Sequence, residues 1–322
     1  MTDRNLAIDS IKGIMIIFVV FGHIVYVGEF KYLFNVFREF IYIFHMPIFL
    51  MLSGYLFRCE LSTSWLKTIF SKLVIPYIFS FSCYLVILYY VGIWGGIEVS
   101  NHINGFQDAL KAIIISPFAS YWYLHSLILF SLFFYISSLI SYKLNFNKLT
   151  LPLTLLLYSV FHFLFFESNF KFFYWVSGYI WLGYIYHYCL KNYRNDDLFI
   201  SCLSVFIVIL SIVISGKVIG FEFQRSLISL VILFFLYFLF KRFNCRVLEF
   251  IGRNSLLIFL FHVYFLNFAK FLSGFLLYFD ESGTFFVIFS LLISVLGSIF
   301  IGLVMDCLNL SKYILGCDNG IK

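Results

Sequence analysis

Charged residues are scarce in this chain of 322 residues, where Asp, Glu, Lys and Arg together make up 12% of the sequence. Soluble proteins carry roughly twice that share, about 25%. The seven cysteines show no CxxC pair and no other spacing typical of metal ligands, so the sequence indicates neither a disulfide framework nor a zinc site. The net charge of +6 is modest for this length and does not suggest nucleic-acid binding. The remainder is strongly apolar, with 62% hydrophobic residues and a mean hydropathy of +0.98.

Runs of about 20 apolar residues recur along the chain, a pattern typical of membrane-spanning helices rather than of a β-barrel. The sequence therefore predicts an all-α integral membrane protein, a single domain over residues 1–322 with about ten transmembrane helices in one bundle. The first span is expected to be retained as an uncleaved helix. An additional interfacial helix is expected around Asp108 to Ile115, in the loop 95–119. The expected spans are residues 8–27, 39–57, 73–94, 120–141, 149–166, 172–189, 198–214, 226–240, 252–271 and 285–305.

The distribution of positive charge predicts the orientation. An even number of spans places both termini on one side of the membrane. If that side is the cytoplasm, 15 of the 22 Lys and Arg residues are cytoplasmic, which is the arrangement that the positive-inside rule favours. We therefore expect a multi-pass protein with both termini cytoplasmic.

Ionisable residues in the first two spans are the strongest candidates for a functional site. Lys12 and His23 are eleven residues apart, close to three helical turns, so they share one face at a separation of roughly 16 Å. His45 is expected at a similar depth in the second span, and Arg38 precedes it by two turns on the same face. Because ionisable side chains within a membrane usually mark function, a proton-handling cavity near the outer side is predicted.

Each of these side chains also has a structural interpretation. A histidine in an apolar helix is often a packed residue that hydrogen-bonds to a neighbouring helix, and Lys12 could extend to the interface. We favour function for His23 and His45. For His125, His162 and His262 both interpretations remain open, and His102 and His187 are expected at the solvated surface.

Two stretches in sequence order resemble the opening of the membrane-bound acyltransferase 3 family, especially its fucose and O-antigen O-acetylases. They are IDSIKGIMIIFVVFGH, residues 8–23, and FHMPIFLMLSGYLF, residues 44–57. These two motifs are specific in combination, whereas the later ones are weak individually. The later blocks are KLVIPY at 72–77, YWYLHSLILF at 121–130, SGYIWLGYIYH at 177–187 and FIGRNSLLIFLFH at 250–262, so the resemblance covers nearly the whole chain.

The resemblance implies an O-acyltransferase of the cell inner membrane. It would move an acetyl group from cytoplasmic acetyl-CoA, a co-substrate, to a hydroxyl of a cell-surface polysaccharide (O-antigen or capsule) or of its lipid-linked precursor. No metal and no permanently bound cofactor are expected. His23 matches the family's catalytic histidine, and Lys12 stands where the family usually has an arginine. Lys67 and Lys72 are the nearest candidates for the basic pair that precedes the family's third span.

This chemistry suits the residues themselves. A neutral imidazole is well matched to accept the proton of a sugar hydroxyl, and Lys12, Lys67, Lys72 and Arg253 are candidates to bind the phosphates of CoA. His45, Arg38 or Tyr26 would orient the base or stabilise the developing oxyanion. Alternatively, His23 takes the acyl group itself as a nucleophile; the sequence leaves the two routes open.

Two other classes of protein compete with the enzyme. Buried His and Lys also mark proton relays in carriers, so a transporter or flippase for a lipid-linked sugar is the alternative, although no inverted repeat supports it. A glycan polymerase would be expected to have larger polar outer loops. Thioester cleavage is the property that separates the acyltransferase from both.

Overall fold

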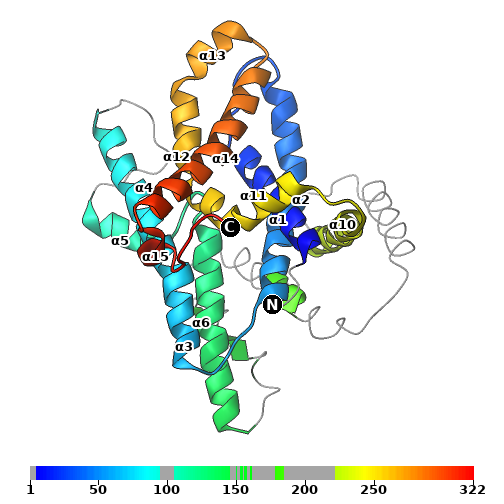
Figure 1. Ribbon diagram of the computed structural model, residues 1–322, viewed down its shortest axis with the longest axis vertical. Coiled ribbons are helices and arrows are strands. Elements are labelled where there is room, and N and C mark those ends of the chain that lie inside the picture. Colours follow the sequence, from blue (N-terminus) through cyan, green and yellow to red (C-terminus); the bar gives the residue numbers. More distant parts are fainter. Residues whose placement is uncertain are drawn as a thin grey trace. The chain divides into compact units, whose positions relative to one another are not determined.

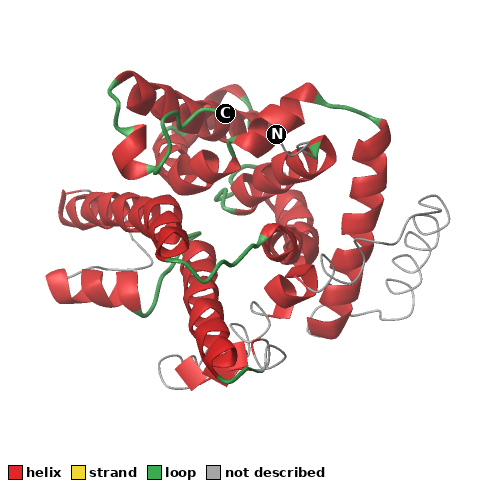
Figure 2. Ribbon diagram, turned by 60° about the horizontal axis from the view of Figure 1, so that its bottom comes forward, coloured by secondary structure: helices red, strands yellow, loops and turns green. Residues whose placement is uncertain are grey.

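The computed structural model describes residues 5–94, 105–145, 178–184 and 222–322, with a few positions between 150 and 161. Within these residues the secondary structure is helical and contains no strand (Figure 2). The chain is organised into two compact units. Unit 1 comprises Met1–Phe57, Gly178–Leu303 and Ile321–Lys322, and unit 2 comprises Arg58–Ser177 and Val304–Gly320.

Unit 1 is built around its first helix. In chain order its helices are α1 (Leu6–Gly22), α2 (Lys31–Leu56), α10 (Glu222–Arg242), α11 (Arg246–Arg253), α12 (Ser255–Phe271), α13 (Ser273–Phe279) and α14 (Thr284–Cys307), the last of which ends in unit 2 (Figure 1). α1 packs against α2, α10, α11 and α12. Its central apolar residues, among them Met15, Ile16 and Val20, are completely buried. A helix that is apolar on every side is suited to this central position.

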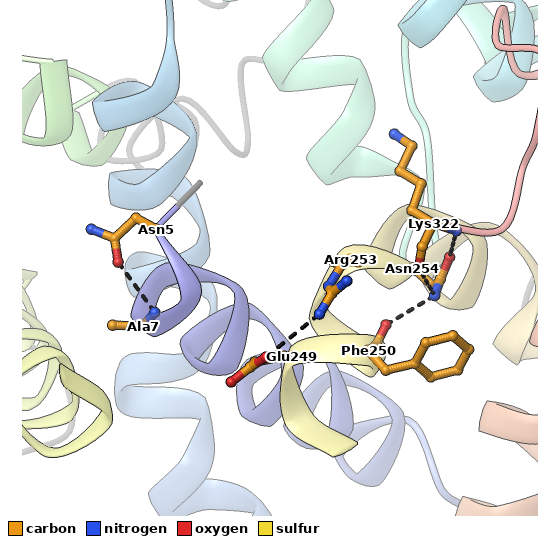
Figure 3. A network of polar contacts seen from close by, with 7 residues as sticks. All are labelled: Asn5, Ala7, Glu249, Phe250, Arg253, Asn254 and Lys322. Atoms are coloured by element: carbon orange, nitrogen blue, oxygen red, sulfur yellow. Dashed lines mark hydrogen bonds and ion pairs between the residues drawn. The ribbon is translucent and has the colours of Figure 1, made fainter. Parts of the chain in front are cut away.

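Local sequence sets both ends of α1. The side-chain oxygen of Asn5 accepts a hydrogen bond from the backbone N–H of Ala7 at 3.1 Å (Figure 3), which caps the first turn. At the other end His23 is the C-cap, and its backbone N–H bonds to the carbonyl of Val20 at 3.1 Å. The helix has 17 residues and is shorter than the expected span 8–27. His23 therefore lies just beyond the end of the helix rather than a turn inside it.

Two glycines allow α1 and α11 to lie in direct backbone contact. A Cβ atom on Gly13 would lie 2.1 Å from the carbonyl oxygen of Leu248, and one on Gly252 would lie 1.8 Å from that of Asp9. Any side chain at either position would therefore displace the helices. Small residues at helix crossings are typical of membrane bundles, where close packing replaces the hydrophobic effect as the source of association.

Asn5, the first described residue, and Lys322 lie at one end of unit 1, called here the terminal end. The backbone N–H of Lys322 donates to Oδ1 of Asn254 at 2.9 Å, and the Asn254 amide donates to the Lys322 carbonyl at 3.3 Å (Figure 3). Asn5 donates to the hydroxyl of Tyr237 near the end of α10, at 3.3 Å. The expectation that both termini are cytoplasmic stays a prediction.

Unit 2 contains α3 (Thr63–Ile69), the π-helical turn η1 (Phe70–Val74), α4 (Ile75–Trp94), α5 (Phe106–Ile114), α6 (Trp122–Lys143) and α15 (Ser311–Ile314). α3, η1 and α4 follow one another without a break, so the third span begins about ten residues earlier than expected. The short helix α5 coincides with the predicted interfacial helix around Asp108 to Ile115. Phe106 and Ile114 at its two ends are exposed, whereas Ala112 is buried.

Seven of the ten expected spans coincide with helices: α1, α2, α3 to α4, α6, α10, α12 and α14. Of these, five are long and apolar enough to cross a membrane, and the pair α11 and α12, bent by 80° at Asn254, would make a sixth. The expected spans 149–166, 172–189 and 198–214 lie largely or wholly outside the described residues. The protein is thus an all-helical membrane protein in the part that the structure describes, and the predicted total of ten spans stays a prediction.

Candidate active site

His23 occupies the junction between α1 and the linker to α2. Its side chain is partly exposed, and among the described residues none hydrogen-bonds to its ring. The preceding residue, Gly22, is fixed by Tyr42 of α2, whose hydroxyl donates to the Gly22 carbonyl at 2.7 Å. The sequence-predicted base therefore has a fixed backbone and an imidazole to which no described residue is hydrogen-bonded.

An aromatic ring from α12, far along the chain, lies beside His23. The rings of His23 and His262 have centroids 5.5 Å apart, inclined at 48°. His262 is fully buried, and its Nδ1–H donates to the carbonyls of Ile258 and Phe259, each at 2.9 Å. Its Nε2 has no hydrogen-bond partner among the described residues. The sequence left the role of His262 open, and the geometry places it in the site.

His45 of α2 approaches the same place from another side. It is 5% exposed, its Nδ1–H donates to the Ile41 carbonyl at 2.7 Å, and its ring lies 5.0 Å from that of Tyr42. Its imidazole is close enough to His23 and Arg225 to interact electrostatically with both. The structure therefore brings together the two histidines that the sequence paired. Because α2 begins at Lys31 rather than near residue 39, His45 lies in the middle of its helix.

Two guanidinium groups lie beside tyrosines of this region. Arg38 lies over the ring of Tyr26, 5.9 Å from its centroid, and the Tyr26 hydroxyl donates to the Phe21 carbonyl at 2.6 Å. Arg225, from α10, donates to the Tyr42 carbonyl at 2.9 Å. Sequence reasoning named Arg38 but missed Arg225. The sequence signal that could have identified Arg225 is its position. It stands immediately before the eighth expected span, at the same expected outer end as Arg38.

At the terminal end α1 and α11 carry a second group of charged residues. Lys12 is partly buried and lies three residues after Asp9, which is 3% exposed. On α11, Glu249 is 5% exposed and pairs with Arg253 at 3.5 Å (Figure 3). Nε of Arg253 is buried with no hydrogen-bond partner among the described residues. Lys12 and Arg253, both named from the sequence, thus stand on neighbouring helices.

Lys67 and Lys72 belong to unit 2. Lys67 is on α3 and Lys72 is in the π-helical turn, and both are exposed. Ser62 caps α3 by accepting a hydrogen bond from the N–H of Trp65 at 3.2 Å. The Trp65 indole N–H donates to the Arg58 carbonyl at 2.6 Å. These bonds fix the start of the helix that presents the two lysines. Their association with Lys12 stays a prediction.

Two linkers cross next to His23. The N–H groups of Glu29 and Phe30 donate to the carbonyls of Glu281 and Ser282, each at 3.0 Å. At the crossing lie Gly28 and Gly283, which both have positive φ angles, +87° and +80°. This conformation favours glycine. The α1–α2 linker and the α13–α14 linker are thereby joined, and we call this contact the linker crossing.

An aspartate orders one of the two linkers. The Asp280 carboxylate accepts hydrogen bonds from the backbone N–H of Phe285 at 2.8 Å and of Ser282 at 3.1 Å. These bonds, that from Phe285 first, hold the pKa of this exposed carboxyl below its ordinary value of 3.8. At neutral pH the group is therefore a carboxylate that stabilises the turn.

His125 is the remaining histidine that the structure describes, and it packs within unit 2. In unit 2, His125 donates from Nε2 to the Ile114 carbonyl at 2.9 Å, and the Tyr77 hydroxyl donates to the adjacent Ile113 carbonyl at 2.7 Å. The two side chains satisfy carbonyls at the C-terminal end of α5, so the packed interpretation fits His125. His102, His162 and His187 lie outside the described residues. Among the residues that the structure describes, no group of three His, Cys, Asp or Glu side chains could hold a metal ion.

Comparison with known proteins bears on the chemistry of this site. A family model described as an acyltransferase domain matches residues 5–303. Two nodulation proteins NolL are similar over shorter stretches: that of Sinorhizobium fredii is 35% identical over 85 residues, and that of Mesorhizobium japonicum is 40% identical over 58. These matches cover 24% and 17% of the chain and 23% and 16% of the relatives.

The chain therefore spans less than a quarter of the length of the curated relatives it matches. No solved structure matches. The family match, in contrast, includes α1, α2, α10, α11 and α12, which together carry the histidines and arginines of the site. With nearly the whole chain matched, the protein belongs to the membrane-bound acyltransferase 3 family.

Proposed function

We propose that this membrane acyltransferase moves an acetyl group from acetyl-CoA to a hydroxyl of a cell-surface polysaccharide, O-antigen or capsule, or of its lipid-linked precursor, in the cell inner membrane. The observation that carries the proposal is the environment of His23. Its ring has no hydrogen-bond partner among the described residues and lies beside two further imidazoles, those of His262 and His45. Such an imidazole can accept a proton from a substrate hydroxyl.

The reaction needs two proton transfers and one exchange of bonds. His23 removes the proton of the acceptor hydroxyl, and the oxygen of that hydroxyl attacks the thioester carbonyl. The new C–O bond forms, the C–S bond breaks, and the CoA thiolate leaves with the proton that His23 returns. Arg225 supplies positive charge near His45, and Arg38 supplies it beside Tyr26. Positive charge at these positions suits the developing oxyanion. In the alternative route His23 itself carries the acetyl group between donor and acceptor.

The donor is proposed to bind with its phosphates at the terminal end. Lys12 is separated from His23 by roughly 16 Å of helix, a distance comparable to the extended pantetheine arm. Arg253 offers a buried N–H without a described partner, and a phosphate oxygen would satisfy it. Lys67 and Lys72 are proposed to contribute further positive charge. The terminal end would then face the cytoplasm, where acetyl-CoA is available, in agreement with the positive-inside rule.

A labelling experiment tests the proposal. Cells or membranes that contain the wild-type protein or His23→Ala are supplied with labelled acetyl-CoA, and label is followed into the surface polysaccharide. We expect transfer by the wild type and none above background by the variant at equal protein level. His102→Ala is the matched control, because the sequence predicts that histidine at the solvated surface. Equal transfer by wild type and His23→Ala would remove His23 from the centre of the mechanism, and no transfer by either would refute the proposed donor.

A further inference from the structure

We infer that His262 is a positioning residue for His23: its Nε2 accepts a hydrogen bond from the His23 ring, directly or through one water, and so determines which His23 nitrogen faces the acceptor hydroxyl. The inference rests on the proposed function for its catalytic meaning. Whether the hydrogen bond forms can be tested without measuring activity.

The tautomer of His262 follows from its partners. Nδ1 lies 2.9 Å from the carbonyl oxygens of Ile258 and Phe259. A carbonyl oxygen can only accept, so Nδ1 must carry a hydrogen. In the neutral ring Nε2 then has a lone pair and acts as an acceptor. The backbone of α12 thus fixes His262 as an acceptor that faces away from its own helix turn.

This acceptor lacks a donor. The His262 side chain is completely buried, and Nε2 has no hydrogen-bond partner among the described residues. Buried polar atoms in native proteins are nearly always paired, so one without a partner calls for an explanation. The Phe259 ring, whose centroid is 6.1 Å away, offers no donor. The ring of His23 does, since a neutral imidazole always carries one N–H.

The distance between the two rings permits the bond. Their centroids are 5.5 Å apart, and no hydrogen bond joins the two rings in the orientation that the structure shows. Because each imidazole nitrogen lies about 1 Å from its centroid, a rotation of the His23 ring or one bridging water completes the bond. The His23 ring has no hydrogen bond to another described residue. Its position is already determined by the bond between Tyr42 and Gly22 at the preceding residue.

The bond has a chemical consequence. When one His23 nitrogen donates to His262, the other keeps its lone pair and can accept the proton of the acceptor hydroxyl. When that proton arrives, the bond to His262 stabilises the imidazolium. A neutral imidazole thereby performs the orienting role that a carboxylate often performs for a catalytic histidine. Among the described residues, His45 on α2 interacts electrostatically with His23, and Arg225 on α10 interacts with His45. The Nδ1–H of His45 is bonded to its own helix.

Kinetics of two variants test the catalytic part. His262→Gln keeps an amide group near the position of Nε2, whereas His262→Leu removes the acceptor. We expect His262→Leu to lower kcat for transfer of label from acetyl-CoA to the endogenous glycans of membrane vesicles by about 100-fold, with KM for acetyl-CoA unchanged. His262→Gln should retain at least about a tenth of the wild-type kcat. Phe261→Leu, a buried substitution on the same helix, controls for lost packing.

If both His262 variants match the wild type, or if His262→Gln is as inactive as His262→Leu at equal folded yield, the positioning role is overturned. If the wild type transfers no acetyl group, the proposed function fails instead, and the catalytic meaning of His262 fails with it. The two failures are therefore distinguishable by the wild-type measurement alone.

Nitrogen NMR tests the hydrogen bond without any substrate. The protein is labelled with ¹⁵N-histidine in lipid nanodiscs, and the His262 signals are assigned by their loss in His262→Gln. We expect Nδ1 of His262 to be protonated and the unprotonated Nε2 to show the shift of a hydrogen-bonded acceptor. In His23→Phe that signal should move toward the value of a free acceptor. An Nε2 shift that is identical in wild type and His23→Phe would overturn the inference.

Discussion

Tyr42 and Gly22 fit together as a pair. The Tyr42 hydroxyl donates to the Gly22 carbonyl at 2.7 Å, and a Cβ atom on Gly22 would lie 2.4 Å from Cε1 of the same ring. Glycine at this position therefore makes room for the tyrosine that satisfies its carbonyl, one of the groups that a helix leaves without a partner at its C-terminal end. The consequence is a fixed α1 terminus directly before His23.

Removal of the Tyr42 hydroxyl should loosen this terminus. We expect Tyr42→Phe to lower the free energy of unfolding by about 1 kcal/mol, the usual contribution of one hydrogen bond, and to reduce kcat, because the backbone before His23 loses its restraint. Thermal unfolding in detergent and acetyl transfer in membranes measure the two effects. Tyr32→Phe, at a side chain that is 81% exposed, is the control. A Tyr42→Phe protein indistinguishable from it would contradict the role assigned to the bond.

The linker crossing should be sensitive to any side chain at its two glycines. In Gly28→Ala the new Cβ would lie 2.7 Å from the Glu281 carbonyl oxygen, and in Gly283→Ala it would lie 2.1 Å from the Val27 carbonyl oxygen. Both residues also have positive φ angles. We expect each variant to be destabilised by at least about 1 kcal/mol and to transfer acetyl groups more slowly. Gly274→Ala, where nothing lies within 4 Å, should be as stable as the wild type. Equal stability of all three variants would show that the crossing is not tightly packed in the membrane.

The contact of α1 with α11 should govern donor binding. Gly252→Ala places a Cβ 1.8 Å from the Asp9 carbonyl oxygen, so α11 must move away from the helix that carries Lys12. We expect a raised KM for acetyl-CoA, measured in membranes, and lower thermal stability. Gly178→Ala meets nothing within 4 Å and provides the comparison. An unchanged KM in Gly252→Ala would argue against donor binding at the terminal end.

Lys12 and Arg38 should affect different substrates. Lys12→Gln removes a charge from the terminal end, so we expect a KM for acetyl-CoA raised by about 10-fold, the effect of losing roughly 1.4 kcal/mol of binding. Arg38→Gln should leave that KM unchanged and lower the rate of transfer to polysaccharide. Initial rates at varied acetyl-CoA concentration separate the two effects. The assignment of either residue fails if the variants show the opposite pattern.

Asp280 gives a pH-dependent contribution to stability. Its pKa is lower in the folded protein than the ordinary value of 3.8, so its contribution is fully present above that value and is lost as the pH falls through the folded pKa. We expect Asp280→Asn to be less stable than the wild type at pH 7 and the difference to shrink below about pH 4. Tryptophan fluorescence during thermal unfolding measures it. A difference that persists undiminished at lower pH would mean that the charge is not responsible.

Local sequence was sufficient for the helical elements. Seven of the spans expected from long apolar runs are helices. The physical reason is that about 20 consecutive apolar residues can satisfy their backbone polar groups in a membrane only as a helix or within a closed barrel. The interfacial helix α5 was predicted from its own pattern. The ends of the helices were harder to predict from the sequence: α1 ends at Gly22 and α2 begins at Lys31. These limits depend on the Tyr42 contact and on the linker crossing, which join residues distant in sequence.

The same division applies to the site. Spacing within the first two spans identified Lys12, His23, His45 and Arg38, because residues on one helix, or on two helices joined by a short linker, have positions that follow from helical geometry. The sequence by itself also determined the family. Only the tertiary structure placed His262 beside His23 and Arg225 beside Tyr42. α10 packs against α1 and α2, and α12 packs against α1, although these helices are far apart in the sequence, and no local pattern encodes which faces of distant helices meet.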